Sequence, residues 1–440
     1  MKYRSTRGAP AVSLDTALVQ GIAEDGGLFL PVELPQFTAD DFDAAESLHA
    51  VAAVLLQPMF AGSSLAGDLQ QIVDETFSFP IPNSELQSAE ACCGVLELFH
   101  GPTAAFKDVG ARFLAACLSR LEGDPAHPLT ILVATSGDTG GAVAAAFDGR
   151  PGMRVAVLYP DGRVSERQAH QLTCWSDNVL SLAVKGSFDD CQRMVKAAMA
   201  DPLLTEKHRF SSANSINIGR LLPQSTYYAF AALSHWRRSG RKASFIVPTG
   251  NLGNAFACYL VRAMGLPVGD IVLATNANRI IVDFLDGEEW SPRSSMPTLA
   301  SAMDVGNPSN MERLRAQGGE ADSLADQVRA VSVSDEEIAA EICRSYEEFG
   351  VACCPHTATA IHAWRNLDSI ERIEKDWVLV ATAHAAKFEQ IVEPLIGNSV
   401  DIPDELAGIL SRERRFTIID ATGKALEDAL ANEFSETPAT

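Results

Sequence analysis

One lysine of the sequence lies where its amine could act as a nucleophile. Lys107 belongs to the segment FHGPTAAFKD (99–108), after a Gly-Pro turn and an apolar residue, and a helical pattern follows it. A lysine held at an apolar helix entrance can form a Schiff base, because desolvation lowers the pKa of its amine and exposes the lone pair. Taken by itself the motif favours a solvated surface charge, since most lysines at helix starts are of that kind.

A loop between a strand-like run and a helical pattern has the composition of an anion-binding site. It is TSGDTGG (135–141), in which Ser136 and Thr139 add hydroxyl donors to the backbone amides and Asp138 lies between them. Such a loop at a helix N-terminus can bind a carboxylate or a phosphate. It can equally be a plain connection with Asp138 as the helix cap, and the segment alone does not decide between the two.

A second loop of this kind is PTGNLGN (248–254), again between a strand-like run and a helical pattern. Glycine and asparagine tolerate left-handed backbone angles, so consecutive amides can converge on one phosphate. The residues that would supply them are Gly250, Asn251, Leu252, Gly253 and Asn254. The loop matches neither GxGxxG nor the Walker A pattern, which disfavours a nicotinamide or an ATP site.

Two further segments carry polar groups that gain meaning only in combination. NSINIGR (214–220) offers amide, hydroxyl and guanidinium donors from Asn214, Ser215, Asn217 and Arg220. An arginine with such neighbours suits bidentate recognition of a phosphate monoester, although a helix cap beside a surface arginine is the simpler interpretation. Thr382, at the end of the strand-like WVLVA, offers a hydroxyl that could meet a ring nitrogen.

The elements that must position these residues alternate along the chain. Short apolar runs, most of them followed by helical patterns, occur at 130–137, 155–160, 179–184, 244–248, 271–276 and 377–384. This pattern predicts parallel strands covered by helices on both faces, with ligands at the carboxyl ends of the strands. The predicted fold class is α/β with at least two lobes, after a mostly helical region that extends to about residue 90.

Composition limits the class of partner. The chain has 440 residues, 47% hydrophobic and 21% charged, with a net charge of −22. Such acidity argues against nucleic acid as a partner, but a few local cations would suffice for a small anionic substrate. No apolar run is long enough to span a membrane, and the first residues lack the apolar core of a signal peptide. We therefore expect no membrane partner and a cytoplasmic location.

The cysteines and histidines indicate neither a disulfide framework nor a metal centre. There are nine cysteines, two pairs of which are adjacent in sequence, and no CxxC pairs with another at zinc-finger spacing. Buried free thiols are the expected state. The nine histidines show no HExxH pattern, so no metal is predicted.

Together these segments resemble the threonine synthase family. FHGPTAAFKD, ATSGDTG, NSINIGRLLPQ, PTGNLGN and ATAHAAKF are similar to the family's motifs in order and interval, as are GIAEDGGLFLP, SAMDVGNPSN and PHTATA. The resemblance covers nearly the whole chain and is closest to the long-chain form. One departure is Ala385, where related sequences often have proline.

The resemblance implies an architecture and a cofactor. The fold would be the fold type II architecture of pyridoxal-phosphate enzymes, with two parallel-sheet α/β lobes and a mostly helical N-terminal region. We expect residues 1–90 to form that region, 91–128 and 213–425 the large cofactor-binding domain, 129–212 the small domain and 426–440 a C-terminal tail. The cofactor would be pyridoxal 5′-phosphate.

Roles carried over from the family fall into two groups. Toward the cofactor, Lys107 would form the covalent link, the amides of Gly250 to Asn254 would hold the phosphate, Asp138 would lie by the ring hydroxyl and Thr382 by the ring nitrogen. Toward the substrate, Ser136 and Thr139 would bind the carboxylate, while Asn214, Ser215, Asn217 and Arg220 would bind the phosphate. Lys107, freed from the cofactor, would also move the protons.

The implied reaction is the conversion of O-phospho-L-homoserine and water to L-threonine and phosphate, by β,γ-elimination and replacement, as the last step of threonine biosynthesis. A related phospholyase would release 2-oxobutyrate, ammonia and phosphate instead. An amino-acid dehydratase is disfavoured because it needs no phosphate pocket, and a non-catalytic protein because the lysine, both glycine loops and Thr382 are all present. The chain would act as a monomer or a homodimer.

Overall fold

The computed structural model describes residues 1–87, 92–135 and 137–434. Several of its helices begin after residues with good capping chemistry, such as Ser187 and Ser334, whose side chains accept from first-turn amides. The helices are α1 (Leu14–Gln20), α2 (Leu48–Leu56), α3 (Leu69–Thr76), α4 (Lys107–Glu122), α5 (Asp138–Phe147), α6 (Glu166–Thr173), α7 (Phe188–Ala200), α8 (Pro202–His208), α9 (Ile218–Ser239), α10 (Gly253–Ala263), α11 (Ile280–Leu285), α12 (Met311–Gly318), α13 (Ala321–Ala325), α14 (Asp335–Phe349), α15 (Pro355–Arg365), α16 (Ser369–Glu374), α17 (Glu389–Ile396), α18 (Asp404–Leu410) and α19 (Gly423–Glu433). Short 3₁₀ turns are η1 (Ala39–Phe42), η2 (Pro58–Phe60), η3 (Ser64–Asp68), η4 (Ser301–Met303) and η5 (Ala385–Phe388).

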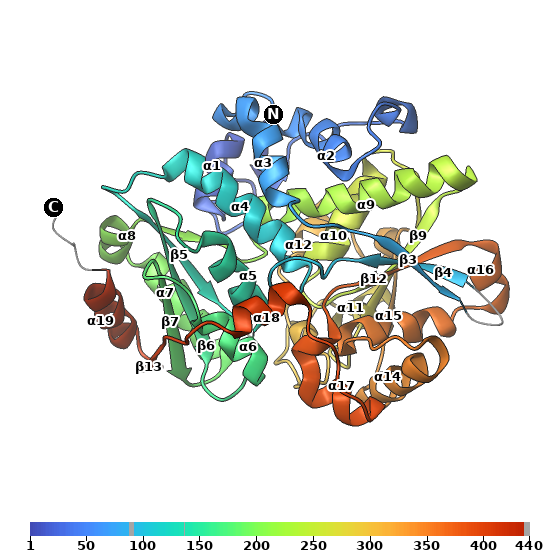
Figure 1. Cartoon of the computed structure of the whole chain (residues 1–440). Helices are drawn as coiled ribbons and strands as arrows, with labels where there is room; N and C mark the ends of the chain where they lie inside the picture. Colours follow the sequence, from blue (N-terminus) through green and yellow to red (C-terminus); the bar gives the residue numbers. More distant parts are fainter. Residues whose placement is uncertain (88–91, 136, 435–440) are drawn as a thin grey trace.

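Within the described ranges the strands form three sheets (Figure 1). An antiparallel pair near the N-terminus joins β1 (Tyr3–Ser5) to β2 (Phe29–Pro31). The large sheet has the order β11-β10-β9-β12-β4-β3, and the small sheet has the order β13-β7-β6-β5-β8. The strands of the large sheet are β3 (Asn83–Gln87), β4 (Cys92–Glu97), β9 (Ala243–Pro248), β10 (Val268–Thr275), β11 (Arg329–Ser332) and β12 (Asp376–Ala381). Those of the small sheet are β5 (Leu129–Ala134), β6 (Met153–Pro160), β7 (Val179–Lys185), β8 (Phe210–Ser212) and β13 (Thr417–Asp420).

The large sheet is parallel except for β3, which pairs antiparallel with β4. Its central strand β9 is buried at every position, and its alternate residues face different cores. Phe245 and Val247 pack into the cluster that contains α4, α9 and α10, whereas Ile246 packs into the cluster that contains α14 and α15. The unbroken apolar run of this strand therefore reflects burial on both faces, as predicted.

The small sheet is parallel throughout. One of its faces packs against α5 and the other against α7 and α19. Helix α4 contacts both α5 and α9, and thus lies between the two sheets. The N-terminal helices α2 and α3 cover α9 and α4, at the top of the view in Figure 1.

These observations confirm the α/β fold class and correct parts of the expected domain division. Strand β3 joins the large sheet, although residues up to 90 were expected to form a separate region. Strand β13 pairs with β7, and α19 packs on α7, so residues 417–434 belong to the small sheet rather than to the large domain and a tail. The apolar side chains of α19 explain this placement, because they can only be buried against another element. Residues 435–440 of the expected tail lie outside the described residues.

Three further findings concern the sequence-based expectations. All nine cysteines lie in the described ranges as free thiols; Cys92 is exposed, Cys343 is partly exposed and the others are buried. Among the described residues, no group of His, Cys, Asp and Glu side chains gathers as metal ligands would. In the same ranges, no helix has the length and apolar character needed to cross a bilayer.

Candidate active site

Lys107 is the first residue of α4 and lies against the end of β12. The turn before it is held by two backbone bonds: the Phe106 amide donates to the Thr382 carbonyl at 2.8 Å, and the His384 amide donates to the Ala104 carbonyl at 3.0 Å. Ala104 has a left-handed φ of 53°, which lets the chain turn sharply just before the lysine. The structure therefore brings the predicted lysine and Thr382 to one edge of the large sheet.

The environment of Lys107 favours its uncharged form. Burial lowers the pKa of the amine to about 8; Lys387 and Arg220 add to this effect, and Asp138 opposes it. An amine with a pKa near 8 is deprotonated in about a tenth of molecules at neutral pH, far more than a surface lysine. This is the property that a nucleophilic lysine needs.

Asp138 is the first residue of α5 and is buried. Its Oδ1 accepts from Gln168 Nε2 at 3.0 Å and forms an ion pair with Lys387 Nζ at 3.0 Å. Burial raises the pKa of this carboxyl, but Lys387 and Lys107 outweigh burial and hold the pKa well below its usual range. Asp138 is therefore an ionised carboxylate beside Lys107, and the helix N-terminus favours that charge further.

The rest of the TSGDTGG loop is shaped by Thr135. Its hydroxyl accepts from the amides of Gly137 and Gly140, at 3.0 and 2.9 Å. Gly137 has a φ of 141°, a backbone angle that other residues rarely adopt. Thr139 follows Asp138 in the first turn of α5 and is partly exposed, while the predicted Ser136 lies outside the described residues.

The glycine loop connects β9 to α10, as predicted, and packs tightly on η4. A Cβ on Gly250 would lie 2.6 Å from Met303 Cα, so only glycine fits there. Leu252 has a left-handed φ of 63°, which turns the chain into α10. Asn254 Oδ1 accepts from the hydroxyls of Tyr227 and Tyr228, while its buried Nδ2 has no partner in the described residues. The loop thus ends at a helix N-terminus with an unused donor.

The NSINIGR segment lies beside this loop. Asn251 Nδ2 donates to Ser215 Oγ at 2.5 Å, which joins two segments that were predicted to bind different phosphates. Arg313, fully buried on α12, donates to the carbonyls of Ser215 and Ile216 and to the side chain of Asn310. Sequence inspection missed Arg313, whose hydrogen bonds hold the backbone of the NSINIGR segment in place.

Arg220 is buried near the start of α9, close to Lys107. Its guanidinium donates to the Ala213 carbonyl and, at 3.4 Å, to the Lys107 carbonyl, and its buried Nε has no partner in the described residues. Burial lowers its pKa to about 10, and Asp108 opposes that effect. No ion pair of Arg220 occurs among the described residues, so this cation lacks the anion that buried arginines usually have.

The two asparagines of the NSINIGR segment differ in whether their side-chain amide groups have hydrogen-bond partners. Asn217 Oδ1 accepts from the Gly219 amide as the cap of α9, and its Nδ2 donates to the carbonyls of Leu18 and Ser212. Its amide group is therefore engaged with the backbone, and the geometry does not support the expected role in substrate binding. Asn214 Oδ1 is buried and has no partner in the described residues.

Two buried residues that sequence inspection gave no role complete the site. Lys387, in η5, pairs with Asp138 and donates to the Thr103 carbonyl at 2.6 Å. His356, on α15, accepts from the Ala302 amide at Nε2, while its Nδ1 has no partner in the described residues. Burial lowers the pKa of His356 to about 4, with Asp138 opposing, so its ring is neutral and Nδ1 carries an unused hydrogen.

The chain is similar to known proteins over nearly its whole length. The profile of the pyridoxal-phosphate dependent enzymes matches residues 79–383, and profiles of the threonine synthase N-terminus and C-terminus match residues 2–77 and 357–430. Threonine synthase of Escherichia coli is 39% identical over 90% of this chain and 91% of its own length. That of Pseudomonas aeruginosa is 36% identical over 95% and 96%. The chain belongs to the threonine synthase family.

Solved structures of threonine synthases have the same fold. The structure of pyridoxal-phosphate-bound threonine synthase from Brucella melitensis matches with a TM-score of 0.90 and 35% identity, over 99% of this chain and 100% of the other. The yeast enzyme matches with a TM-score of 0.86 and 29% identity, over 99% of each chain. These matches confirm the family resemblance, the fold type and pyridoxal 5′-phosphate as the cofactor. The chain is a pyridoxal-phosphate-dependent lyase of the threonine synthase type.

The residues of this threonine synthase family member fit that cofactor. Lys107 supplies an amine of lowered pKa, and the α10 N-terminus follows a glycine loop that can approach a phosphate closely. A Cβ on Gly253 would meet nothing closer than 3.5 Å, so the first turn of α10 has room beside it. The unpartnered Nδ2 of Asn254 and Nδ1 of His356 are the buried donors that a bound polar group would satisfy.

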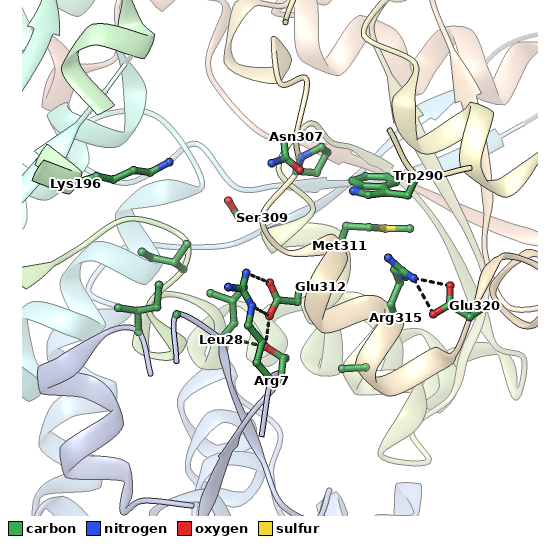
Figure 2. A pocket seen from close by; sticks show the side chains of 16 residues that line it. Arg7, Leu28, Lys196, Trp290, Asn307, Ser309, Met311, Glu312, Arg315 and Glu320 are labelled. Atoms are coloured by element: carbon green, nitrogen blue, oxygen red, sulfur yellow. Dashed lines mark hydrogen bonds and ion pairs between the residues drawn. The ribbon is translucent and has the colours of Figure 1, made fainter. Parts of the chain in front are cut away.

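A pocket of about 650 Å³ lies next to the site, behind the segments that form it (Figure 2). Ile216 and Ser309 line it, whereas Lys107 and Asp138 do not. Figure 2 shows Lys196 on one side, Asn307 across from it, and Glu312 paired with Arg7 below. The Ser309 amide donates to Asn251 Oδ1 at 2.6 Å, and this hydrogen bond connects the pocket wall to the glycine loop.

Proposed function

We propose that the chain converts O-phospho-L-homoserine and water to L-threonine and phosphate, the last step of threonine biosynthesis. The observation that carries the proposal is the buried Arg220 beside Lys107. Arg220 has only carbonyl partners and an unused Nε, and it lies close to an amine of lowered pKa. A second phosphate, separate from that of the cofactor, is the group that such a cation would bind.

In the proposed mechanism the bound cofactor supplies an electron sink at the substrate's α-carbon. Lys107 removes the α-proton with its free amine, and a β-proton is lost next. After the phosphate has left, the γ-carbon gains a proton, water adds at the β-carbon, and Lys107 returns a proton to the α-carbon. The Ser215 hydroxyl, which accepts from Asn251 Nδ2 at 2.5 Å, would hold the departing phosphate together with Arg220. These donors act where negative charge develops as the carbon–oxygen bond breaks.

Other residues hold the reactants in place. The amides of Gly250 to Asn254 would bind the cofactor phosphate, and Thr382 would meet the ring nitrogen. Asp138 would lie by the ring hydroxyl, and Thr139 with Ser136 would bind the substrate carboxylate. The assignments of Thr382 and Asp138 are supported by the end of β12 and the start of α5, which lie beside Lys107. That of the glycine loop is supported by its place at the N-terminus of α10.

The two sheets would act as lobes that close over the substrate. Helix α4 lies between them, so Lys107 lies where the lobes meet. Closure would exclude bulk water until one water molecule adds at the β-carbon. We further propose that the chain works in the cytoplasm as a monomer or a homodimer.

Product analysis tests the proposal. The purified chain with pyridoxal phosphate is incubated with O-phospho-L-homoserine in ¹⁸O-labelled water, and the products are measured by mass spectrometry. We expect threonine and phosphate in equal amounts, with the label in the new hydroxyl. Stoichiometric 2-oxobutyrate with little threonine would instead make the chain a phospholyase, and no phosphate release would refute both assignments.

A further inference from the structure

Two lysines and two carboxyl groups gather at the site: Lys107 is partly buried, whereas Lys387, Asp138 and Asp108 are buried. Lys387 is 0% exposed, and its Nζ lies 3.0 Å from Asp138 Oδ1 and 2.6 Å from the Thr103 carbonyl oxygen to which it donates. Within the described ranges, the amine of Lys107 makes no hydrogen bond or ion pair, and its Nζ lies 5.9 Å from the centre of the Phe106 ring. Asp138 thus forms an ion pair with Lys387 and none with Lys107.

The neighbouring elements place further ionisable groups near Lys107. Asp138 of α5, Lys387 of η5, Arg220 of α9 and His356 of α15 each interact electrostatically with Lys107. Asp108, the second residue of α4, interacts with Lys387 and Arg220. Asp138 alone favours a charged Lys107; Lys387 and Arg220 are cations that disfavour it, and His356 is neutral. If Lys387 were absent, Lys107 would be the cation with the strongest remaining effect on the Asp138 carboxylate. Attraction between the two groups would then favour a charged Lys107 amine.

We propose that Lys387 is a positioning residue for the reaction: by occupying the Asp138 carboxylate, it keeps the Lys107 amine uncharged and free to react. The proposal rests on the proposed role of Lys107 as the reacting amine. Lys387 contacts neither the substrate nor the reacting atoms, and it acts through Asp138.

A purely structural role for Lys387 is the alternative, because its bond to Thr103 also ties η5 to the turn before α4. Loss of activity in a variant would not separate the two roles. The pKa of Lys107 separates them, because a structural bond affects folding and retention of the cofactor but does not by itself add or remove a charge partner. The test therefore measures the protonation of Lys107 directly.

The experiment uses the full-length chain freed of cofactor. Competitive labelling with acetic anhydride at a series of pH values, followed by peptide mass spectrometry, gives the pKa of the Lys107 amine, with the exposed Lys242 as internal reference. In Lys387→Met the Lys107 pKa should rise by about one unit or more. In Lys387→Arg, which keeps the cation, it should stay near the wild-type value. In the double variant Asp138→Asn, Lys387→Met it should lie below that of Lys387→Met.

Asp138→Asn alone keeps the proposal testable if Lys387→Met fails to fold. Its Lys107 pKa should fall, because Lys387 then faces Lys107 as an unpaired cation. An unchanged Lys107 pKa in Lys387→Met, an equal rise in the double variant, or a rise in Asp138→Asn would each overturn the proposal. Labelling reports on Lys107 whatever the substrate is, so this outcome is independent of the product analysis.

Discussion

At the scale of single residues, the site concentrates positive charge in a strongly acidic chain. Lys387 and Arg220 flank Lys107, and Asp138 is the ionised carboxylate that opposes them. The chain as a whole carries a net charge of −22, so this arrangement is local. A cofactor and a substrate that each bring a phosphate would balance it, which is why burial of these cations is tolerable in the working enzyme.

Replacing Lys107 by alanine should abolish turnover without harming the fold. The reaction would lose its proton carrier, and general acid–base catalysis alone contributes about 10²–10⁴-fold. The free energy of unfolding of the cofactor-free chain should stay the same or rise, because a desolvated amine is removed. Borohydride reduction and peptide mapping of the wild type should place the pyridoxyl group on Lys107. Lys242→Ala is the matched surface control, and a label on another lysine would refute the assignment.

Replacing Arg220 by alanine should damage turnover of the phosphorylated substrate far more than cofactor retention. A phosphate left without its charged partner would cost roughly 3–5 kcal/mol in kcat/KM. Arg220→Lys keeps a cation but not the planar donor set, and should recover only part of the loss. Steady-state kinetics and equilibrium dialysis of the cofactor measure the two effects. Equal losses of both would place Arg220 at the cofactor or in the fold instead.

At the scale of elements, the glycine loop depends on its close packing against η4. A methyl group on Gly250 would lie 2.6 Å from Met303 Cα and 2.8 Å from its carbonyl oxygen, both of them backbone atoms that cannot move cheaply. Gly250→Ala should therefore lower the free energy of unfolding of the cofactor-free chain by about 1–3 kcal/mol. Gly253→Ala, whose Cβ would have ordinary contacts from 3.5 Å outward, is the matched control and should leave it nearly unchanged. Thermal denaturation of both variants measures the difference.

The elements also show how far sequence could predict the site. Lys107, Asp138, the glycine loop and Thr382 follow strand ends, and parallel topology alone brings such residues together. The role of Lys387 could not be predicted from the sequence, because it depends on an ion pair with Asp138. The two residues are far apart in the chain, and no local pattern reveals such a pair. Asn217 shows a different limit: an asparagine before a helix has the composition of a ligand and of a cap alike, and in the structure its side chain caps α9.

At the scale of the whole molecule, residues 417–434 belong to a different sheet from the one that was expected. After crossing the large sheet the chain returns to add β13 and α19 to the small one (Figure 1). The signal was present in the sequence, since Leu426, Leu430 and Phe434 recur at every fourth position, as on one helix face. Those side chains are buried in the cluster that holds β6, β7 and α7. The C-terminal segment is therefore part of the core of the small lobe.

This placement predicts that a substitution in α19 destabilises the small sheet without destabilising the large one. Leu430 is 0% exposed, so Leu430→Ala should leave a cavity and cost about 2–5 kcal/mol in the small sheet's stability. Ile418, on β13, is 50% exposed, and Ile418→Ala should cost about 1 kcal/mol or less. Hydrogen exchange followed by mass spectrometry should show faster exchange in β7 and α7 of Leu430→Ala, while β9 of the large sheet keeps its protection. Equal acceleration in both sheets would mean that the two lobes unfold as one cooperative unit.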